Sequence, residues 1–223
     1  MDGQIIRFPV ERRGSAPPEP ERHPYPSGFG ALPVPAEAGD ASRSCALLSV
    51  ELRRLGGEEA PASMDADVAN AIVNRCVLAA LEVLSRAPAV VELAGTTTRP
   101  VIDARFEGVR CELDATRAAL TIRDAVRRVQ RRVENAVQVL AAVASGSLAE
   151  TDEQVTVTVG APEDVADRMR ERAAPGQILV TEAVWSACRG EVAGDPYASP
   201  MDVGLEQPVA VFELNDLGDP GRS

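Results

Sequence analysis

The stretch GAPEDVADRMRERAAPGQILVTEAVW, residues 160–185, is the most informative part of the sequence. Pro162 suits the first turn of a helix, and the following pattern of apolar and charged residues predicts that this helix runs through Arg172. Ala-Ala-Pro-Gly-Gln then turns the chain into a short apolar strand, Ile-Leu-Val-Thr-Glu. Thr181 can cap a short helix directly after it. Elements packed this closely are typical of a sheet with helices on its faces.

Outward from this stretch, alternating and helical periodicities define the other elements. We expect strands at 45–52, 89–95, 101–109, 137–145, 154–160 and 208–214, and helices from Ser63 to Arg86 and from 114 to 134. The strands at 89–95 and 101–109 flank a short polar loop and predict a hairpin, and Gly146 is expected to open a loop. The fold class is therefore mixed α/β, with helices packed on a mixed sheet that begins with a ferredoxin-like βαββαβ core.

Composition gives the domain organisation. The chain has 223 residues and a formal net charge of -11, and aromatic residues make up only 3% of it, so Val, Leu, Ile and Ala must form the core. All 23 basic residues are arginine. We expect a disordered, Pro-rich tail at 1–43, one folded domain at 44–215 and a flexible C-terminus at 216–223.

Composition also excludes several kinds of function. An acidic chain repels phosphate backbones, so we expect no nucleic-acid partner. No apolar run approaches the ~20 residues of a membrane span, and the N-terminus has no signal-peptide core, so we expect a cytoplasmic protein with no membrane partner. The single histidine, His23, lies in the Pro-rich segment, which excludes histidine-dependent triads in the folded part. The four cysteines form no CxxC pair and are expected to be buried thiols.

Several motifs together resemble the catalytic domain of class III adenylate and guanylate cyclases. That family typically reads Gly-Asp-x-Val-Asn-x-Ala-x-Arg and then Pro-Gly-Gln-Ile-Leu-Val-Ser/Thr-Glu, which residues 160–182 resemble. Three further segments resemble the family's first strand, the helix after it and its last strand: CALLSVELRRL (45–55), ANAIVNRCVLAALEVLSR (69–86) and PVAVFEL (208–214). The resemblance covers about residues 44–215 and implies the cyclase fold.

The resemblance also implies a reaction that depends on two metal ions. In the family, two Asp hold two Mg²⁺ ions, which activate the ribose 3′-oxygen for attack on the α-phosphate. The first-strand Asp falls on Glu51, which is one methylene longer, and Mg²⁺ tolerates little error in its ligand geometry. The hairpin Asp falls on Thr96, whose neutral hydroxyl supplies no negative charge. Asp103 on the next strand could replace it only if the hairpin is shifted in register.

The other family positions are substituted as well, with one exception. The Lys that recognises adenine in the family aligns with Glu92, which has the opposite charge. The chain has no lysine that could take its place. The base-reading Asp falls on Ala161 and the ribose-positioning Asn on Asp164. The Arg that stabilises the transition state is retained as Arg168. The glycine-rich strand and turn that approach the phosphates are replaced by residues 140–148.

Two of these residues also have simpler interpretations. Glu51 could be a solvated carboxylate at the end of a strand rather than a metal ligand. Arg168 could form an ion pair with Asp164, Asp167 or Glu171 on its own helix rather than contact a nucleotide phosphate. We expect no resident cofactor, and Mg²⁺ or Mn²⁺ only together with a bound nucleotide.

The helix at 114–134 is basic in an otherwise acidic chain. Its arginines could form a solvated helix face or a docking surface for an acidic partner or a phosphate-rich ligand. The residues of this candidate interaction surface are Arg123, Arg127, Arg128, Arg131 and Arg132.

Three functional hypotheses follow. The first is a degenerate cyclase-like domain without activity of its own, which acts as a dimerisation, regulatory or nucleotide-sensing module, as a homodimer or with another cyclase-like chain. The second is a divergent cyclase, active as the Arg-donating half of a heterodimer. The third is an interaction domain that uses the arginine-rich helix at 114–134.

Overall fold

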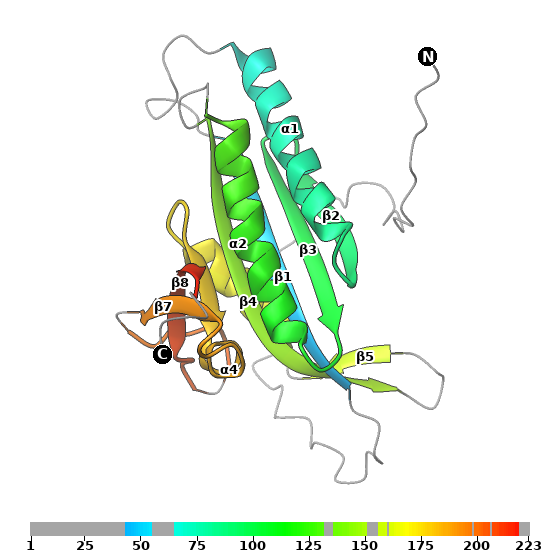
Figure 1. Ribbon diagram of the computed structural model, residues 1–223, viewed down its shortest axis with the longest axis vertical. Coiled ribbons are helices and arrows are strands. Elements are labelled where there is room, and N and C mark those ends of the chain that lie inside the picture. The colour runs from blue at the N-terminus through cyan, green and yellow to red at the C-terminus, as the bar shows by residue number, and fades with distance from the viewer. Residues whose placement is uncertain are drawn as a thin grey trace, which may run out of the picture. The chain divides into compact units, whose positions relative to one another are not determined.

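The computed structural model describes residues 43–54, 65–131, 136–150, 156–159, 161–197, 199–205 and 207–218. Its strands are β1 (Arg43–Arg54), β2 (Ala89–Thr96), β3 (Arg99–Glu107), β4 (Val137–Glu150), β5 (Thr156–Val159), β6 (Ile178–Thr181), β7 (Val192–Pro196) and β8 (Val211–Leu217). Its helices are α1 (Ala66–Leu84), α2 (Cys111–Val129), α3 (Pro162–Arg172) and α4 (Glu182–Ala187). Figure 1 shows these elements along the chain.

The strands form one mixed sheet in the order β2-β3-β1-β4-β6-β8-β7, and β5 pairs with β4. The first four strands pair antiparallel in the order β2-β3-β1-β4, which confirms the ferredoxin-like core. β4 and β6 run parallel, and β8 and β7 follow antiparallel. The predicted mixed α/β fold is therefore confirmed, and the hairpin joins β2 to β3 as expected.

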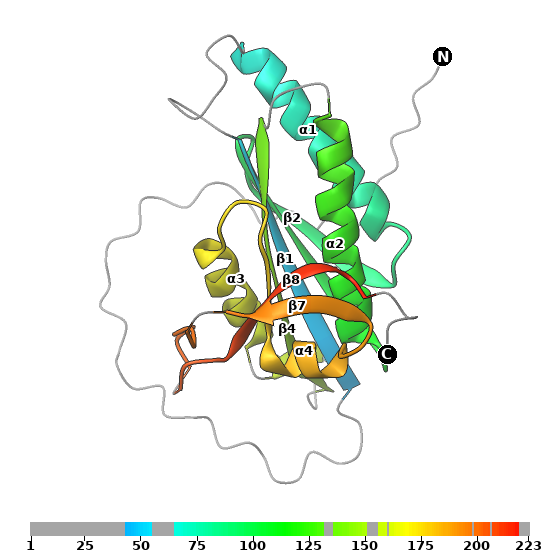
Figure 2. The same ribbon diagram turned by 60° about the vertical axis from the view of Figure 1, so that its left-hand side comes forward.

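Helices cover both faces of this sheet. Figure 2 shows α1 and α2 on one face and α3 on the other. Along β1, Leu48, Val50 and Leu52 belong to the core under α1 and α2, whereas Cys45 and Leu47 belong to the core under α3. The central strands are buried on both faces, which is why they read as continuous apolar runs rather than alternating ones.

Several element boundaries differ from the sequence prediction. β4 does not end before Gly146 but continues through it to Glu150, because Gly146 pairs with Cys45 of β1 and the strand then pairs with β5. The expected loop at Gly146 was wrong. β7 was not predicted, and β8 extends from Val211 to Leu217, beyond the end of the strand expected at 208–214.

Helix ends also differ. The first turn of α1 is capped by Asp65, whose carboxylate accepts a hydrogen bond from the backbone N–H of Asp67 at 2.8 Å, while the predicted cap Ser63 lies outside the described residues. α2 begins at Cys111 rather than at 114. Residues 1–42 of the segment predicted as a disordered tail also lie outside the described residues, whereas Arg43 begins β1. No helix within the described part of the chain is long and apolar enough to cross a membrane.

Ala161, directly before α3, has a backbone conformation that alanine rarely adopts. It is the one residue other than glycine with a positive φ among those the structure describes, with φ of 47° and ψ of 44°. The left-handed conformation costs a residue with a Cβ about 1–2 kcal/mol. Ala161 also offers no side chain to cap the helix, so α3 begins without a side-chain hydrogen bond.

We therefore expect Ala161→Gly to stabilise the domain by about 0.5–1 kcal/mol, because glycine adopts this conformation without steric cost. Urea denaturation measures the effect. The matched control is Ala71→Gly on the exposed face of α1, which should destabilise by about 1 kcal/mol. Equal destabilisation by both variants would contradict the strained conformation of Ala161.

Candidate functional site

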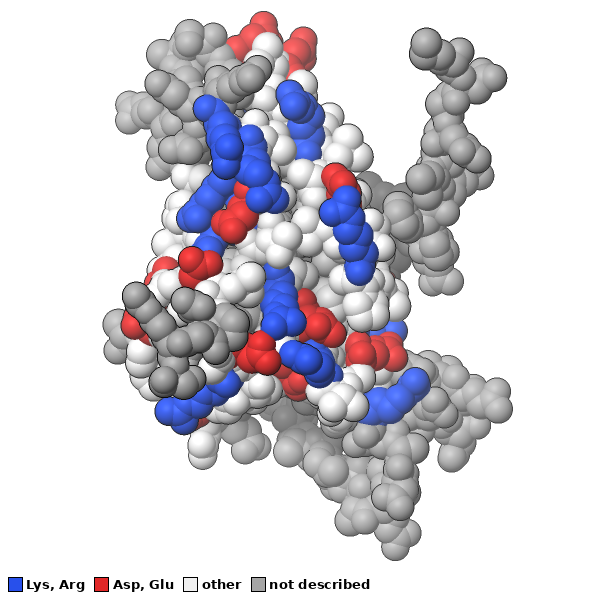
Figure 3. All heavy atoms as spheres, viewed as in Figure 1, with Lys and Arg blue, Asp and Glu red and all other residues white. Residues whose placement is uncertain are grey.

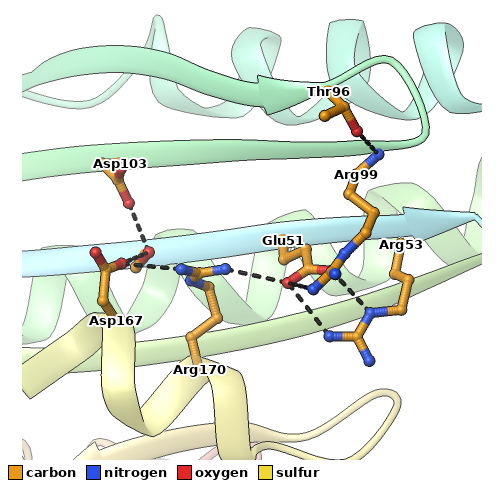
Figure 4. Close-up of polar contacts among 8 residues, drawn as sticks. Glu51, Arg53, Thr96, Arg99, Asp103, Asp167 and Arg170 are labelled. Carbon is orange, nitrogen blue, oxygen red and sulfur yellow. Dashed lines mark hydrogen bonds and ion pairs between the residues drawn. The ribbon is translucent and has the colours of Figure 1, made fainter. Parts of the chain in front are cut away.

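Glu51 on β1 is the centre of the site. Its side chain is only 1% exposed, although it carries a charge. Arg53 donates from Nε and Nη2 to its two carboxylate oxygens at 2.7 and 3.3 Å. Arg99, from the start of β3, does the same at 2.8 and 3.2 Å. Arg170 of α3 adds a contact from Nη1 at 3.1 Å. Figure 4 shows the three guanidinium groups converging on Glu51 from different elements.

These contacts explain why the carboxylate of Glu51 stays ionised in the core. Burial by itself would raise its pKa, but the hydrogen bonds and charges of Arg99 and Arg53 outweigh burial and lower the pKa of Glu51 to about 2. Forked arginine–carboxylate pairs are among the strongest hydrogen bonds in proteins. The interpretation of Glu51 as a solvated strand-end carboxylate is therefore wrong, because the side chain is enclosed and paired.

The network continues from Arg170 towards β3. Arg170 Nη2 donates to Asp167 Oδ1 at 3.2 Å. The hydroxyl of Ser49 lies 2.8 Å from Asp167 Oδ1 and 2.5 Å from Asp103 Oδ1. A hydroxyl has only one proton to donate, so a second proton must lie on one of the two carboxyl groups for both contacts to be hydrogen bonds. Burial, followed by the charge of Asp167, raises the pKa of Asp103 above its ordinary value, and the hydrogen bond from Ser49 opposes this by lowering it.

The hairpin keeps the register that was expected, without a shift. Asp103 lies opposite Ser49, and Glu51 lies opposite Val101. Asp103 therefore does not take the place expected for the second metal-binding Asp. Thr96 lies at the exposed end of β2, where its hydroxyl accepts a hydrogen bond from the backbone N–H of Arg99 at 3.1 Å.

A cavity of about 150 Å³ opens beside this network, between the strands β1 to β3 and α3. Its charged lining consists of Glu92, Asp103, Arg105, Glu163 and Asp167. Four of these five side chains are acidic, so the cavity carries an excess of negative charge that disfavours a triphosphate.

The two remaining family positions on α3 are both exposed. Asp164 lies in the first turn, and Arg168 lies one turn further. The guanidinium of Arg168 lies against the backbone of Gly204. A Cβ added at Gly204 would lie only 1.7 Å from Arg168 Nη1, so a larger residue at 204 would displace this side chain. Arg168 makes no hydrogen bond or ion pair with any described residue, so the expected ion pair on its own helix was wrong. Asp167 pairs with Arg170 instead.

The arginines of α2 divide into two groups. Arg123 is only 6% exposed, and its Nη1 and Nη2 donate to the backbone carbonyls of Leu214 and Asn215 at 3.4 and 2.7 Å. Its assignment to an interaction surface was therefore wrong, because it joins α2 to β8. Arg127, Arg128 and Arg131 are exposed, whereas Arg132 lies outside the described residues.

The resemblance implies Mg²⁺ at this site, and the residues present do not fit it. The two oxygens of Glu51 offer about four lone-pair sites, and five N–H groups already occupy them. Thr96 contributes a neutral hydroxyl in place of a second carboxylate. No group of His, Cys, Asp or Glu suited to hold a metal ion occurs in the part of the chain that the structure describes.

Sequence reasoning located Glu51 but missed its partners. Arg53 could have been found, because it lies two residues from Glu51 on the same face of a strand. Arg99 required the hairpin register, which places the start of β3 near the end of β1. Arg170 required the position of α3 on the sheet, which no local pattern reveals.

Comparison with known proteins identifies the fold. No family model and no curated protein matches the sequence. The solved structures that resemble it include the adenylyl cyclase CyaB from P. aeruginosa, with a TM-score of 0.61 and 11% identity over 79% of this chain and 96% of that chain. The guanylate cyclase domain of RhGC from Catenaria anguillulae, in complex with GTP, gives 0.60 and 13% over 78% and 97%.

A third similar structure is the non-canonical dimeric guanylyl cyclase domain of the RhoGC fusion protein from Blastocladiella emersonii, with a TM-score of 0.59 and 13% identity over 78% of this chain and 97% of that chain. The chain therefore has the fold of the class III adenylyl and guanylyl cyclase catalytic domains. At these identities the likeness shows the fold alone.

The low pKa of Glu51 predicts how stability depends on pH. Because its folded pKa of about 2 is below the ordinary 4.5, its contribution is present above pH 4.5 and is lost as pH falls towards 2. We expect Glu51→Gln to destabilise the domain by about 3–5 kcal/mol at neutral pH, since it removes the buried charge partner of Arg170 and leaves only the half-exposed Asp167. The difference from the unmodified domain should shrink below pH 4.5.

Urea denaturation between pH 3 and 7 tests this, with Glu82→Gln as control. Glu82 pairs with Arg86 on the surface, so its variant should change stability by less than about 1 kcal/mol at every pH. Parallel pH profiles for the unmodified domain and Glu51→Gln would contradict the buried ion pair.

Asp103 predicts the opposite pH dependence. Its folded pKa is raised above 3.8, so the folded state binds the proton more tightly and loses stability as pH rises through the folded pKa. Asp103→Asn should therefore become progressively more stable than the unmodified domain as pH rises. Thermal denaturation over a pH series from below 3.8 to neutral pH measures the difference, and a constant difference over the whole series would contradict the raised pKa of Asp103.

Proposed function

We propose that this chain is a catalytically silent, cyclase-like domain that acts as a dimerisation, regulatory or nucleotide-sensing module. The observation that carries the proposal is the neutralisation of Glu51 by Arg53, Arg99 and Arg170. A cyclase needs a carboxylate whose lone pairs are free to bind a metal ion. In this chain, guanidinium groups already occupy the lone pairs of Glu51.

The energetics support the loss of metal-dependent chemistry. A metal ion at Glu51 would have to displace arginine donors, and buried Arg170 would then keep only the half-exposed Asp167 as a charge partner. Breaking a buried pair in this way costs about 3–5 kcal/mol. A divalent cation would also meet the repulsion of three guanidinium groups at short range.

The positions that would bind the base and ribose support the same proposal. Glu92 brings a negative charge to the cavity in place of a lysine, and Ala161 has no group to read a base. Asp164 is an exposed carboxylate in place of the amide that would position the ribose. Each change weakens binding of a nucleotide, which carries several negative charges of its own.

A second candidate function is the Arg-donating half of a composite active site. The observation that favours it is the exposed guanidinium of Arg168, which makes no hydrogen bond or ion pair with any described residue. In this version the metal ions and the base-reading groups come from a second, complete cyclase chain.

Dimerisation is part of the proposal because composite sites at a dimer interface are typical of class III cyclases. The similar guanylyl cyclase domain from Blastocladiella emersonii is described as a non-canonical dimer. A domain that keeps the fold and loses catalytic activity would still have such a dimer interface, through which it could act on a partner.

The test is a cyclase assay with a sensitive product measurement, paired with calorimetry of ATP and GTP in the presence of Mg²⁺ or Mn²⁺. The adenylyl cyclase from P. aeruginosa serves as the active control. We expect no cyclic nucleotide from this chain alone, because its central carboxylate cannot hold a metal ion. Turnover that Glu51→Gln abolishes would contradict the proposal.

The same experiment separates the versions of the function. Nucleotide binding without turnover favours the sensing version, and dimerisation without binding, measured by analytical ultracentrifugation, favours the interaction version. Product formed only on mixing with an active cyclase, and lost in Arg168→Ala, favours the composite site.

A further inference from the structure

The exposed arginines at the C-terminal end of α2 form a second feature of the molecule, separate from the Glu51 site. We call Arg127, Arg128 and Arg131 the α2-end surface. Figure 3 shows basic side chains gathered over this end of α2. Arg127 Nη1 lies 3.6 Å from Asp124 Oδ1. Both side chains are about half exposed or more, so this ion pair is weak. The side chains of Arg128 and Arg131 make no hydrogen bond or ion pair with any described residue.

The other arginines of this region are engaged in the fold. Arg110 and Arg117 both donate to Glu191, at 3.4 and 2.7 Å. Arg123 donates to the backbone carbonyls of Leu214 and Asn215, both in β8. The α2-end surface is thus a concentration of positive charge, with only Arg127 weakly paired, in a chain whose net charge is -11. The negative end of the helix favours the cations of its last turn, Arg127 and Arg128.

A hollow of about 280 Å³ lies beside these arginines. It is bounded by the last turns of α2, the start of β4 and the turn before β6, and its lining residues are Arg123, Val126, Arg127, Gln130, Val137, Gln138, Val139, Pro175 and Gly176. Its lining is mixed, with valine and proline beside arginine and glutamine. Arg123, nine-tenths buried in this lining, has an Nε–H without a hydrogen-bond acceptor, although Nε lies 3.7 Å from Asp124 Oδ1.

We propose that the α2-end surface and this hollow dock an acidic peptide segment of a protein partner. A Glu or Asp side chain of the partner would pair with Arg128 and Arg131, and a neighbouring apolar side chain would enter the hollow. Arginine suits this role because its planar group binds carboxylates with two parallel hydrogen bonds. The proposal uses none of the residues of the Glu51 site and does not depend on the proposed function.

Two other ligands fit less well. A nucleic acid duplex carries one charge per ~1.7 Å and needs a long basic track, whereas Arg127 to Arg131 span only about 6 Å of helix. A free phosphate would make no use of the valine and proline side chains in the lining of the hollow. An acidic peptide with adjacent apolar residues matches both the charge of the arginines and this mixed lining.

The test is fluorescence anisotropy on the full chain with a labelled peptide of repeating Glu-Leu-Glu units. The comparison probes are the same peptide with Gln in place of Glu, a single-stranded DNA and inorganic tripolyphosphate as competitor. We expect the acidic peptide to bind at least about tenfold more tightly than the Gln peptide, with an affinity that falls as salt rises.

The decisive variants carry the same change in net charge at two places. The double variant Arg128→Glu and Arg131→Glu should lower the affinity for the acidic peptide at least about tenfold. The control, Arg75→Glu with Arg172→Glu, changes exposed arginines on α1 and α3 and should leave affinity within about twofold. Circular dichroism confirms that both variants are folded.

Three results would overturn the proposal. Equal loss in both double variants would mean a general effect of net charge. If DNA binds more tightly than the acidic peptide, or if tripolyphosphate at the same concentration of charge displaces the peptide completely, the surface is a site for phosphates. Absence of peptide binding at low salt would mean that the α2-end surface is a solvated helix face.

Discussion

A carboxylate removed from water must be neutralised where it lies, and in this protein that requirement falls on Glu51. Its side chain is almost fully buried, and three guanidinium groups enclose it. The groups come from β1, from the start of β3 and from α3. The ion-pair cluster therefore fixes the end of β1, the hairpin and the position of α3 at once, and the rest of the site follows from it.

The same requirement connects this site with the chemistry of cyclases. A carboxylate on the first strand of this fold has to be balanced by positive charge, and either metal ions or arginines can supply it. Metal ions are exchangeable and leave coordination positions for a substrate. Arginines from the chain itself are permanent, occupy the lone pairs of Glu51 and tie it to the scaffold. The fold remains intact with arginine, while a metal-dependent reaction loses its ligand.

Local patterns in the sequence predicted most of the fold but little of the site. Helical periodicity predicted the helices, because each buries one face, and continuous apolar runs predicted the central strands, because these are buried on both faces. The continuation of β4 beyond Gly146 could not be predicted, because it depends on pairing with β5. β7 is short and largely exposed, so it has no apolar pattern to detect. The resemblance located Glu51, Thr96 and Arg168, but their surroundings depend on long-range contacts. Arg123 was misassigned because helical spacing alone does not show that β8 packs over it.

We propose that arginines take the place of metal ions at Glu51. Electron paramagnetic resonance of free Mn²⁺, titrated with the domain in the presence and absence of ATP, tests this proposal. We expect the unmodified domain and Glu51→Gln to deplete free Mn²⁺ equally, by weak binding to an acidic surface alone. Stoichiometric binding of Mn²⁺ that disappears in Glu51→Gln would show instead that Glu51 is a metal ligand.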